Sequence, residues 1–258
     1  MEFKIKLTDF LNEFIKGAKL QEIGVGCSDS QIAKITKDSG VYFLKVSENP
    51  NVQTEHMKLK WLQGKLPVPK IVSYEEQDGA NYLLTESLGG EMVCFDGYIK
   101  NYKQGLGIII DAFKVLKNID ISDCPFNVGL DYKLGLIKNN IDNNLLDINN
   151  INSDILAKYG SINGIYDYLI SNRPNEELIF SHGDTSLPNI FGNGDKLVGF
   201  IDVAECGIAD FWFDVAITAK SIKRNYGADA VQEFYQKLGR DTKHDSIEYY
   251  TVMMNLYL

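Results

Sequence analysis

The chain has 258 residues, 45% of them apolar, and its 35 acidic and 26 basic side chains give a formal net charge of −9. This charge disfavours nucleic acid and anionic membranes as partners and would attract a cationic ligand. No apolar run reaches the twenty or so residues of a membrane span and the first residues mix charges, so we expect a cytoplasmic protein. The four cysteines form no Cys-x-x-Cys pair, which disfavours a zinc site or a disulfide framework.

The N-terminal third combines one helical pattern with short β-prone runs. Apolar residues recur at helical spacing from Phe3 to Ile15, which predicts an amphipathic helix ending near Gly17. Two hairpins are predicted over residues 20–46, and a further strand pair over 70–86. In the first hairpin turn, Gly26 and Ser28 could approach phosphates. An ordinary turn nevertheless explains a lone Gly-x-Gly better.

Lys45 stands in a strand pattern whose two faces are both apolar. A helix over residues 51–63 would place Glu55 on an otherwise apolar stripe that faces inward. Because an unpaired buried charge is costly, we predict that Lys45 and Glu55 form an ion pair. Taken singly, each would be explained better by a side chain that reaches solvent from the edge of the core. Together they match the lysine and glutamate that position nucleotide phosphates in kinases.

The composition changes at residues 88–90, a Leu-Gly-Gly run after which long helical patterns replace β-prone ones. We therefore expect an α+β protein with two lobes. A small β-rich lobe over residues 1–88 would bind nucleotide, and a larger, mostly helical lobe over 89–258 would carry the rest of the site. Helices of the second lobe are predicted at 105–119, 136–154, 165–170, 210–217, 231–239 and 247–258.

The central stretch of the chain, residues 180–191, carries an aspartate and an asparagine five positions apart, Asp184 and Asn189. A second aspartate, Asp202, follows the apolar run 197–201. Phosphoryl transfer needs a base for the acceptor hydroxyl, oxygen ligands for Mg²⁺ and a cation on the phosphates. In that chemistry Asp184 accepts the proton, and Asn189 and Asp202 hold Mg²⁺.

Lys45 would then bind the α- and β-phosphates. An Asp and an Asn at this spacing are also common in turns, so alone they decide little. Four elements in kinase order, ending at Asp202, favour a kinase.

Two further residues are predicted to support this loop. His182 is flanked by Gly183 and Asp184, and we interpret it as a structural histidine that bonds backbone and transfers no proton. Asp214 is surrounded by apolar neighbours, so it should accept backbone hydrogen bonds and hold the loop in shape. Asp210 is placed to cap the helix that contains Asp214.

These motifs resemble the aminoglycoside phosphotransferase family, most closely its 3′-phosphotransferases. The matching residues span nearly the whole chain: 61–69, 119–125, 181–184, 189–191, 199–202, Gly207, 209–210, Trp212 and 214–216. The resemblance implies a protein-kinase-like fold and ATP or GTP with Mg²⁺. It further implies transfer of the γ-phosphate to an aminoglycoside hydroxyl, with the 3′-hydroxyl as the favoured position, and hence antibiotic resistance. It assigns the nucleotide to Ser28 and to a hinge made of Leu84, Thr85, Glu86 and Ser87, and it supports the roles of Asp184, Asn189, Asp202, Lys45 and Glu55.

The chain departs from the family pattern where the acceptor would bind. The 3′-phosphotransferases usually end in an acidic and aromatic tail, whereas residues 253–258 contain no acid. Residues 161–166 also lack acids, and Ala204 and Glu205 stand where the family commonly has Gly and Arg. Candidates for holding a cationic acceptor are Asp154, Asp167, Glu205, Asp229, Asn255 and Tyr257.

Two other functions stay open: a metabolite kinase of the same fold that acts on a sugar or an amino alcohol, and a nucleotide-binding pseudokinase. No expected catalytic position is missing, which disfavours the pseudokinase. A protein kinase is disfavoured because no clear activation segment lies between Asp202 and Asp214. We expect a monomer or weak dimer that binds a nucleotide and a small cationic molecule, but neither nucleic acid nor a membrane.

Overall fold

The computed structural model describes residues 3–23 and 30–257 and divides the chain into two compact units. The first unit consists of Met1–Glu91 and Val198–Ala204, and the second of Met92–Leu197 and Glu205–Leu258. A short segment from late in the sequence, with Asp202 in it, is therefore part of the N-terminal unit. Across the described residues, no helix is both long and apolar enough to cross a membrane.

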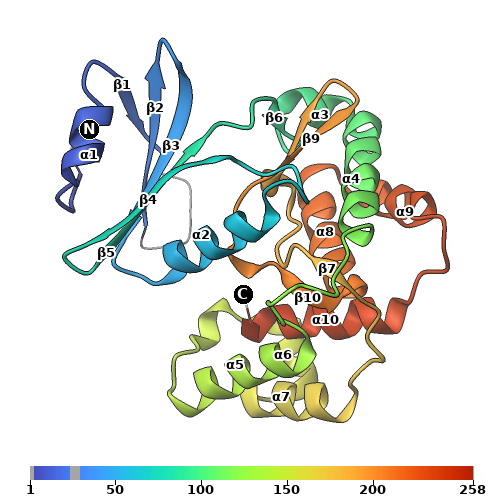
Figure 1. Ribbon diagram of the computed structural model, residues 1–258. Coiled ribbons are helices and arrows are strands. Elements are labelled where there is room, and N and C mark those ends of the chain that lie inside the picture. Colours follow the sequence, from blue (N-terminus) through green and yellow to red (C-terminus); the bar gives the residue numbers. More distant parts are fainter. Residues whose placement is uncertain (1–2, 24–29, 258) are drawn as a thin grey trace. The chain divides into compact units, whose positions relative to one another are not determined.

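The first unit is built on an antiparallel five-stranded sheet with strand order β1-β2-β3-β5-β4 (Figure 1). Both predicted hairpin regions form strands. The β4–β5 turn contains Asp78 and Gly79, whose φ angles of 53° and 83° suit a tight turn. The strands are β1 (Lys19–Glu22), β2 (Gln31–Lys37), β3 (Gly40–Ser47), β4 (Ile71–Gln77) and β5 (Ala80–Glu86).

Two helices of this unit, α1 (Asp9–Phe14) and α2 (Asn51–Leu62), use different faces of the sheet. Leu44 and Val46 of β3 belong to the buried cluster that also contains Leu11 of α1. Side chains alternate along a strand, so Lys45 projects from the opposite face. That is the face on which α2 supplies a partner for it.

The predicted N-terminal helix is shorter than its apolar pattern, and its predicted start at Phe3 was wrong. The helix begins only after Thr8, whose hydroxyl accepts a hydrogen bond from the Leu11 amide at 3.2 Å. Leu7 precedes the helix, yet it is buried in the same cluster. The pattern thus reports a shared core rather than one continuous helix. Phe10, by contrast, is 47% exposed.

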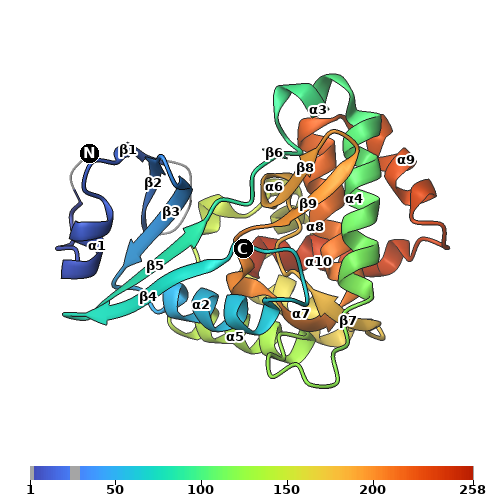
Figure 2. The same ribbon diagram turned by 45° about the horizontal axis from the view of Figure 1, so that its top comes forward.

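The second unit is mostly helical and contains the small sheet formed by β7 and β10 (Figure 2). Strands β10 and β7 pair antiparallel, and a further sheet has the order β6-β8-β9. The strands are β6 (Glu91–Met92), β7 (Leu178–Ser181), β8 (Ile190–Asn193), β9 (Lys196–Phe200) and β10 (Gly207–Asp210). The helices are α3 (Asp96–Lys100), α4 (Tyr102–Lys117), α5 (Leu130–Asp142), α6 (Ser153–Tyr159), α7 (Ile162–Ser171), α8 (Phe211–Asn225), α9 (Ala228–Lys237) and α10 (His244–Tyr257).

Helix α8 is the buried centre of this unit, and α9 and α10 pack against it. Asp210 caps it as predicted, accepting a hydrogen bond from the Trp212 amide at 3.3 Å. Three polar residues of α8 are buried as well: Asp214, Thr218 and Ser221. Their spacing of four and then three residues puts them on one face of the helix. This polar face carries the loop described next.

Candidate active site

The loop between β7 and β8, residues 181–189, is fixed by the polar face of α8. Asp214 accepts hydrogen bonds from the backbone amides of His182 (3.0 Å) and Gly183 (3.1 Å). Farther along the helix, Thr218 donates to the carbonyl of Thr185 at 3.0 Å, and Ser221 accepts from the Leu187 amide at 3.0 Å. One helix face therefore binds the loop at four backbone groups.

Burial raises the pKa of Asp214, although the amides that it accepts and the neighbouring His182 favour its charged form. His182 is fully buried, and its Nδ1 accepts a hydrogen bond from the Asp184 amide at 3.3 Å. The contacts of both side chains described here are thus made with the backbone of the loop. Asp184 is the residue that they hold in position.

Gly183 allows a close backbone approach next to Asp184. Its φ angle is +81°, a conformation that side chains disfavour, and a Cβ there would lie 2.3 Å from the carbonyl oxygen of Glu205. The loop and the Glu205 backbone can pack this tightly only because the residue is glycine. As a result, the Glu205 backbone lies against the residue that precedes Asp184.

Asp184 and Asn189 are joined through the asparagine side chain. Nδ2 of Asn189 donates to Oδ2 of Asp184 at 2.8 Å and to the Asp184 carbonyl at 3.0 Å. The second carboxylate oxygen of Asp184 accepts from the Ser186 amide at 3.3 Å. Because the Asn189 amide group is held by its nitrogen, Oδ1 is the atom of that side chain that could bind a cation.

The first unit holds a separate group of predicted residues around Lys45. Its Nζ lies 2.5 Å from Oε2 of Glu55 and 3.3 Å from Oδ1 of Asp202. Burial alone would lower the pKa of Lys45, but the charges of the two carboxylates outweigh it, and the pKa is raised. Lys45 is therefore a cation at neutral pH, held between two acids.

Asp202 has a backbone conformation that is uncommon for any residue other than glycine. Its φ angle is +57°, and its side chain is 53% exposed. Such conformations store strain and persist where surrounding contacts enforce them, often at functional sites. Asp202 thus combines an accessible carboxylate with a constrained backbone.

The predicted nucleotide residues are only partly described. Gly26 and Ser28 lie outside the described residues. In the predicted hinge, the Glu86 amide donates to the Lys70 carbonyl at 2.9 Å, and the Ser87 amide donates to the Val41 carbonyl at 2.9 Å. Two hinge amides are therefore paired within the unit. Leu84 and Thr85 belong to β5, where both are buried.

The six candidates for acceptor binding have different surroundings. Glu205 accepts a hydrogen bond from the hydroxyl of Tyr257 at 2.9 Å. Asn255 instead bonds the backbone, with its Oδ1 accepting from the Asn152 amide at 3.1 Å. The other three are exposed acids in α6, α7 and α9: Asp154, Asp167 and Asp229.

Tyr257 connects Glu205 to a buried lysine. Nζ of Lys133 lies 3.4 Å from the Tyr257 hydroxyl and 4.7 Å from the centre of its ring, and it also lies 4.2 Å from the centre of the Phe213 ring. Burial, together with the Glu205 charge, raises the pKa of Tyr257. The phenol therefore keeps its proton and donates a hydrogen bond to Glu205.

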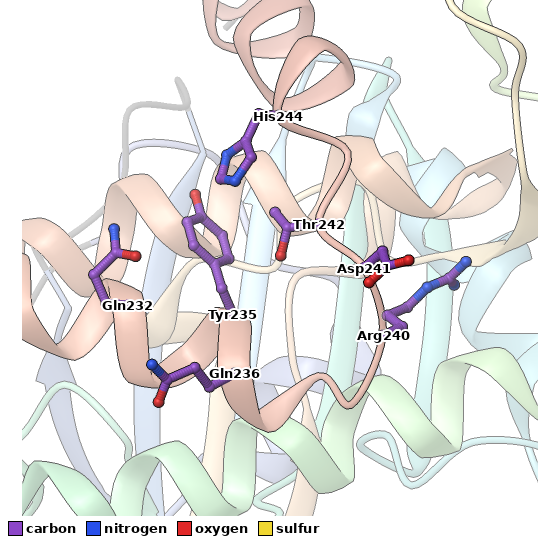
Figure 3. Close-up of a pocket in the computed structure, with 7 residues that line it drawn as sticks. All are labelled: Gln232, Tyr235, Gln236, Arg240, Asp241, Thr242 and His244. Carbon is purple, nitrogen blue, oxygen red and sulfur yellow. The ribbon is translucent and has the colours of Figure 1, made fainter.

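A surface pocket of about 320 Å³ lies elsewhere in the second unit, between α9 and the start of α10 (Figure 3). Tyr235 and His244 face each other there, with ring centres 6.0 Å apart. Arg240 points away from this ring pair, and its guanidinium is bonded to Glu177. No lining residue is among the predicted site residues, so this pocket is not the candidate active site.

Sequence reasoning missed three residues that support the site. Thr218 and Ser221 follow Asp214 at helical spacing, and this pattern is visible in the sequence of an otherwise apolar helix. Lys58 follows Glu55 by three residues on α2, and it is buried with its Nζ 2.5 Å from the Ala204 carbonyl. The spacing of Lys58 indicated an inward position, but nothing in the sequence indicated its partner.

Comparisons with known proteins bear on both groups of predicted residues, the one around Asp184 and the one around Lys45. A family model described as "Phosphotransferase enzyme family" matches residues 19–250. An aminoglycoside 3′-phosphotransferase of Enterococcus faecalis is 30% identical, covering 98% of this chain and 99% of its own. One of Niallia circulans is 32% identical over 93% of each chain.

The structure resembles that of an aminoglycoside phosphotransferase of Streptomyces rimosus, solved with ADP and streptomycin. The TM-score is 0.72 at 18% identity, over 98% of this chain and 100% of the other. The α+β, protein-kinase-like fold and the resemblance stated from the motifs are thus confirmed. The chain belongs to the phosphotransferase enzyme family.

Proposed function

We propose that this protein is a kinase that transfers the γ-phosphate of ATP or GTP to a hydroxyl of an aminoglycoside and so confers resistance. The 3′-hydroxyl is the favoured acceptor position. The observation that carries phosphoryl transfer is the ion-pair network in which Lys45 contacts both Glu55 and Asp202. The aminoglycoside acceptor is supported by the names of relatives that match nearly the whole chain. The cytoplasm, which supplies the nucleotide, is the proposed site of action.

The side chains divide the work of the transfer. Asp184 accepts the proton of the attacking hydroxyl, and its carboxylate is oriented by the Asn189 amide. Lys45 contacts the α- and β-phosphates, with Glu55 orienting its ammonium group. Asp214 keeps the backbone of the 181–189 loop rigid, which fixes the direction of Asp184. His182, which is also buried, supports the same backbone by accepting a hydrogen bond from the Asp184 amide.

The donor set fits Mg²⁺, which prefers oxygen ligands and is usually bound by one or two carboxylates plus phosphates and water. Asp202 offers an exposed carboxylate, and Asn189 offers Oδ1 because its nitrogen is engaged. Within the described parts of the chain, no three His, Cys, Asp or Glu residues gather as a metal cluster. When held by Asp202 and Asn189, Mg²⁺ would supply positive charge that neutralises the nucleotide phosphates.

The nucleotide base would lie against the hinge formed by Leu84, Thr85, Glu86 and Ser87. Since the amides of Glu86 and Ser87 are already paired, carbonyl oxygens of this segment are the groups we expect to contact the base. Gly26 and Ser28 are proposed to contact the phosphates.

The acceptor is proposed to bind beside Asp184 with one ammonium group on Glu205. The Glu205 backbone packs on Gly183, and its carboxylate is oriented by Tyr257. Asp154, Asp167 and Asp229 are exposed acids that could add weaker attraction. Asn255 is bonded to its own unit, which makes a direct acceptor contact less favourable.

A screen for nucleoside diphosphate release tests the proposal. ATP and GTP are each offered with Mg²⁺ and with aminoglycosides, other antibiotics, sugars and amino alcohols, and Asp184→Asn serves as the inactive control. Release that requires an aminoglycoside, with product carrying one more phosphate by mass spectrometry, is the expected result. Turnover of a sugar or amino alcohol with no aminoglycoside turned over would replace the resistance function by a metabolite kinase.

That second function is favoured by one observation, the lack of any acid at the end of α10. Met253 and Met254 are buried there, and Asn255 bonds the Asn152 amide. A multiply charged acceptor usually requires several carboxylates, whereas a sugar or an amino alcohol needs few. Nucleotide binding without turnover of any acceptor would indicate the pseudokinase.

A further inference from the structure

Lys58 is a buried lysine that joins α2 to the segment containing Asp202. Its side chain is 5% exposed, and its Nζ donates to the backbone carbonyl of Ala204 at 2.5 Å. Both residues belong to the first unit. Because the acceptor is a carbonyl of the main chain, this bond controls the backbone two residues after Asp202.

Glu55 and Lys58 are three residues apart on α2 and share one face of the helix. From this face Glu55 contacts Lys45, and Lys45 contacts Asp202. The Lys58 bond to Ala204 leads back to the same segment. The contacts form a closed ring in which the 202–204 segment is held once through a side chain and once through its backbone.

A lysine at this position is costly and therefore needs a reason. Its buried neighbours on α2 include Val52, Leu59 and Leu62, which are apolar, and an apolar side chain could fill the position of Lys58 without desolvating a charge. What an apolar side chain cannot do is donate a hydrogen bond to the Ala204 carbonyl. Asp202, with φ of +57°, is the strained residue that this bond can hold.

We propose that Lys58 is a positioning residue for Asp202, which makes the metal-dependent part of nucleotide binding depend on α2. This inference rests on the proposed function, because it assigns to Asp202 a role with the Mg²⁺ nucleotide. Loss of the Lys58 bond frees the backbone of the segment, so the carboxylate spends less time in the orientation that binds the ion. Nucleotide binding without Mg²⁺ does not use that orientation.

The test is calorimetric titration of the full-length protein with ADP, with and without Mg²⁺, together with the melting temperature. Lys58→Met removes the donor but keeps an unbranched side chain, whereas Lys58→Arg keeps a donor. Lys60→Met is the matched control, because Lys60 is an exposed lysine on the same helix. Lys58→Gln is a second loss variant, since its nitrogen ends one atom short of Nζ and a 2.5 Å contact cannot be made.

We expect Lys58→Met to raise the Mg²⁺ concentration for half-maximal ADP binding about tenfold, with metal-free ADP affinity unchanged. Lys58→Arg should restore most of the effect, and Lys60→Met should behave as the original protein. Equal loss of metal-free and metal-dependent affinity, or no difference between the Lys58 variants and Lys60→Met, overturns the inference. If Lys58→Met does not fold, Lys58→Gln and Lys58→Arg decide it by the same criterion. Failure of the unaltered protein to bind ADP would instead reject the proposed function.

Discussion

The amide nitrogen of Asn189 donates to the carboxylate of Asp184 over 2.8 Å, so the two polar residues of the 181–189 loop are oriented as a pair. The same nitrogen bonds the Asp184 carbonyl at 3.0 Å. One asparagine therefore fixes both the side chain and the backbone of the proposed base, while its own oxygen stays available for a cation. The proposed proton acceptor and the proposed metal ligand, held this way, fit a phosphoryl transfer site.

Replacement of the proposed base should separate binding from chemistry. In Asp184→Asn the side chain keeps its size and polarity but cannot take the proton, so we expect turnover to fall about a thousandfold. The affinity for Mg²⁺ nucleotide should stay within about threefold, measured by calorimetry. Asp245→Asn, at an exposed position in α10, is the control and should keep full activity. Undiminished turnover in Asp184→Asn would remove Asp184 from the role of base.

Two buried aspartates should give different results when changed to asparagine: Asp210 at the end of β10 and Asp214 in the first turn of α8. Asp214 accepts backbone amides on both carboxylate oxygens, so an asparagine must turn its NH₂ against an N–H group. Asp210 accepts amides on Oδ1 only, while Oδ2 accepts from the hydroxyl of Tyr250, which could in turn accept a bond from NH₂.

We therefore expect Asp214→Asn to lower the free energy of unfolding by about 2–3 kcal/mol and to reduce kcat at least tenfold. Asp210→Asn should cost about 1 kcal/mol and leave kcat nearly unchanged. Urea unfolding and steady-state kinetics measure the two quantities. Equal kcat values in the two variants would mean that Asp214 does not shape the loop for catalysis.

The sequence was sufficient where partners lie close in the chain or where a pattern demands one. Glu55 was predictable because a strand lysine with two apolar faces needs an acid, and helical spacing supplied it. The loop support from Asp214 followed from a carboxylate among apolar neighbours. The Lys58 bond to Ala204 was beyond reach, because it joins residues 146 positions apart and uses a carbonyl, which every residue has. The N-terminal helix was overextended because residues outside a helix can pack on the same core as those within it.

The Lys45 and Glu55 pair should contribute to both stability and nucleotide binding. In Glu55→Gln, Lys45 loses one of its two described carboxylate partners and keeps Asp202. The Lys45 side chain is only 20% exposed, so water compensates for the lost charge only in part. We expect the free energy of unfolding to fall by about 2 kcal/mol and the affinity for nucleotide to fall about tenfold. Chemical unfolding and calorimetry check this, with Glu48→Gln, an exposed acid of the same unit, as control. If both variants match the original protein, the ion pair has no role.

An ion pair outside the site predicts how stability depends on pH. Arg240 contacts both carboxylate oxygens of Glu177 at 2.7 Å, and this hydrogen bonding lowers the pKa of Glu177 below 4.5 despite partial burial. A carboxyl group whose pKa is lowered by folding stabilises the protein fully above its unfolded pKa, and the stabilisation is lost as the pH falls through the folded pKa.

The unfolding free energy of the original protein should therefore exceed that of Glu177→Gln by about 1–2 kcal/mol near pH 7. The difference should shrink below the ordinary pKa of 4.5, and unfolding curves from about pH 7 to about pH 3 would follow it. Glu248→Gln breaks an exposed pair with Lys158 and should change stability little at any pH. A difference for Glu177→Gln that grows toward acid would contradict the assignment.

Glu205 and Tyr257 should determine how tightly the acceptor binds. Glu205→Gln removes the negative charge of a residue whose backbone packs on Gly183, so KM for a cationic acceptor should rise about tenfold while KM for the nucleotide stays the same. Tyr257→Phe keeps the ring near Lys133 but loses the 2.9 Å hydrogen bond to Glu205, so its effect should be smaller and of the same sign. Steady-state kinetics with acceptors of increasing amine number measures this, because the Glu205→Gln effect should fade for an acceptor without amines. A KM for polyamine acceptors that is unchanged in Glu205→Gln would place the ammonium group elsewhere, on the exposed acids of α6, α7 or α9.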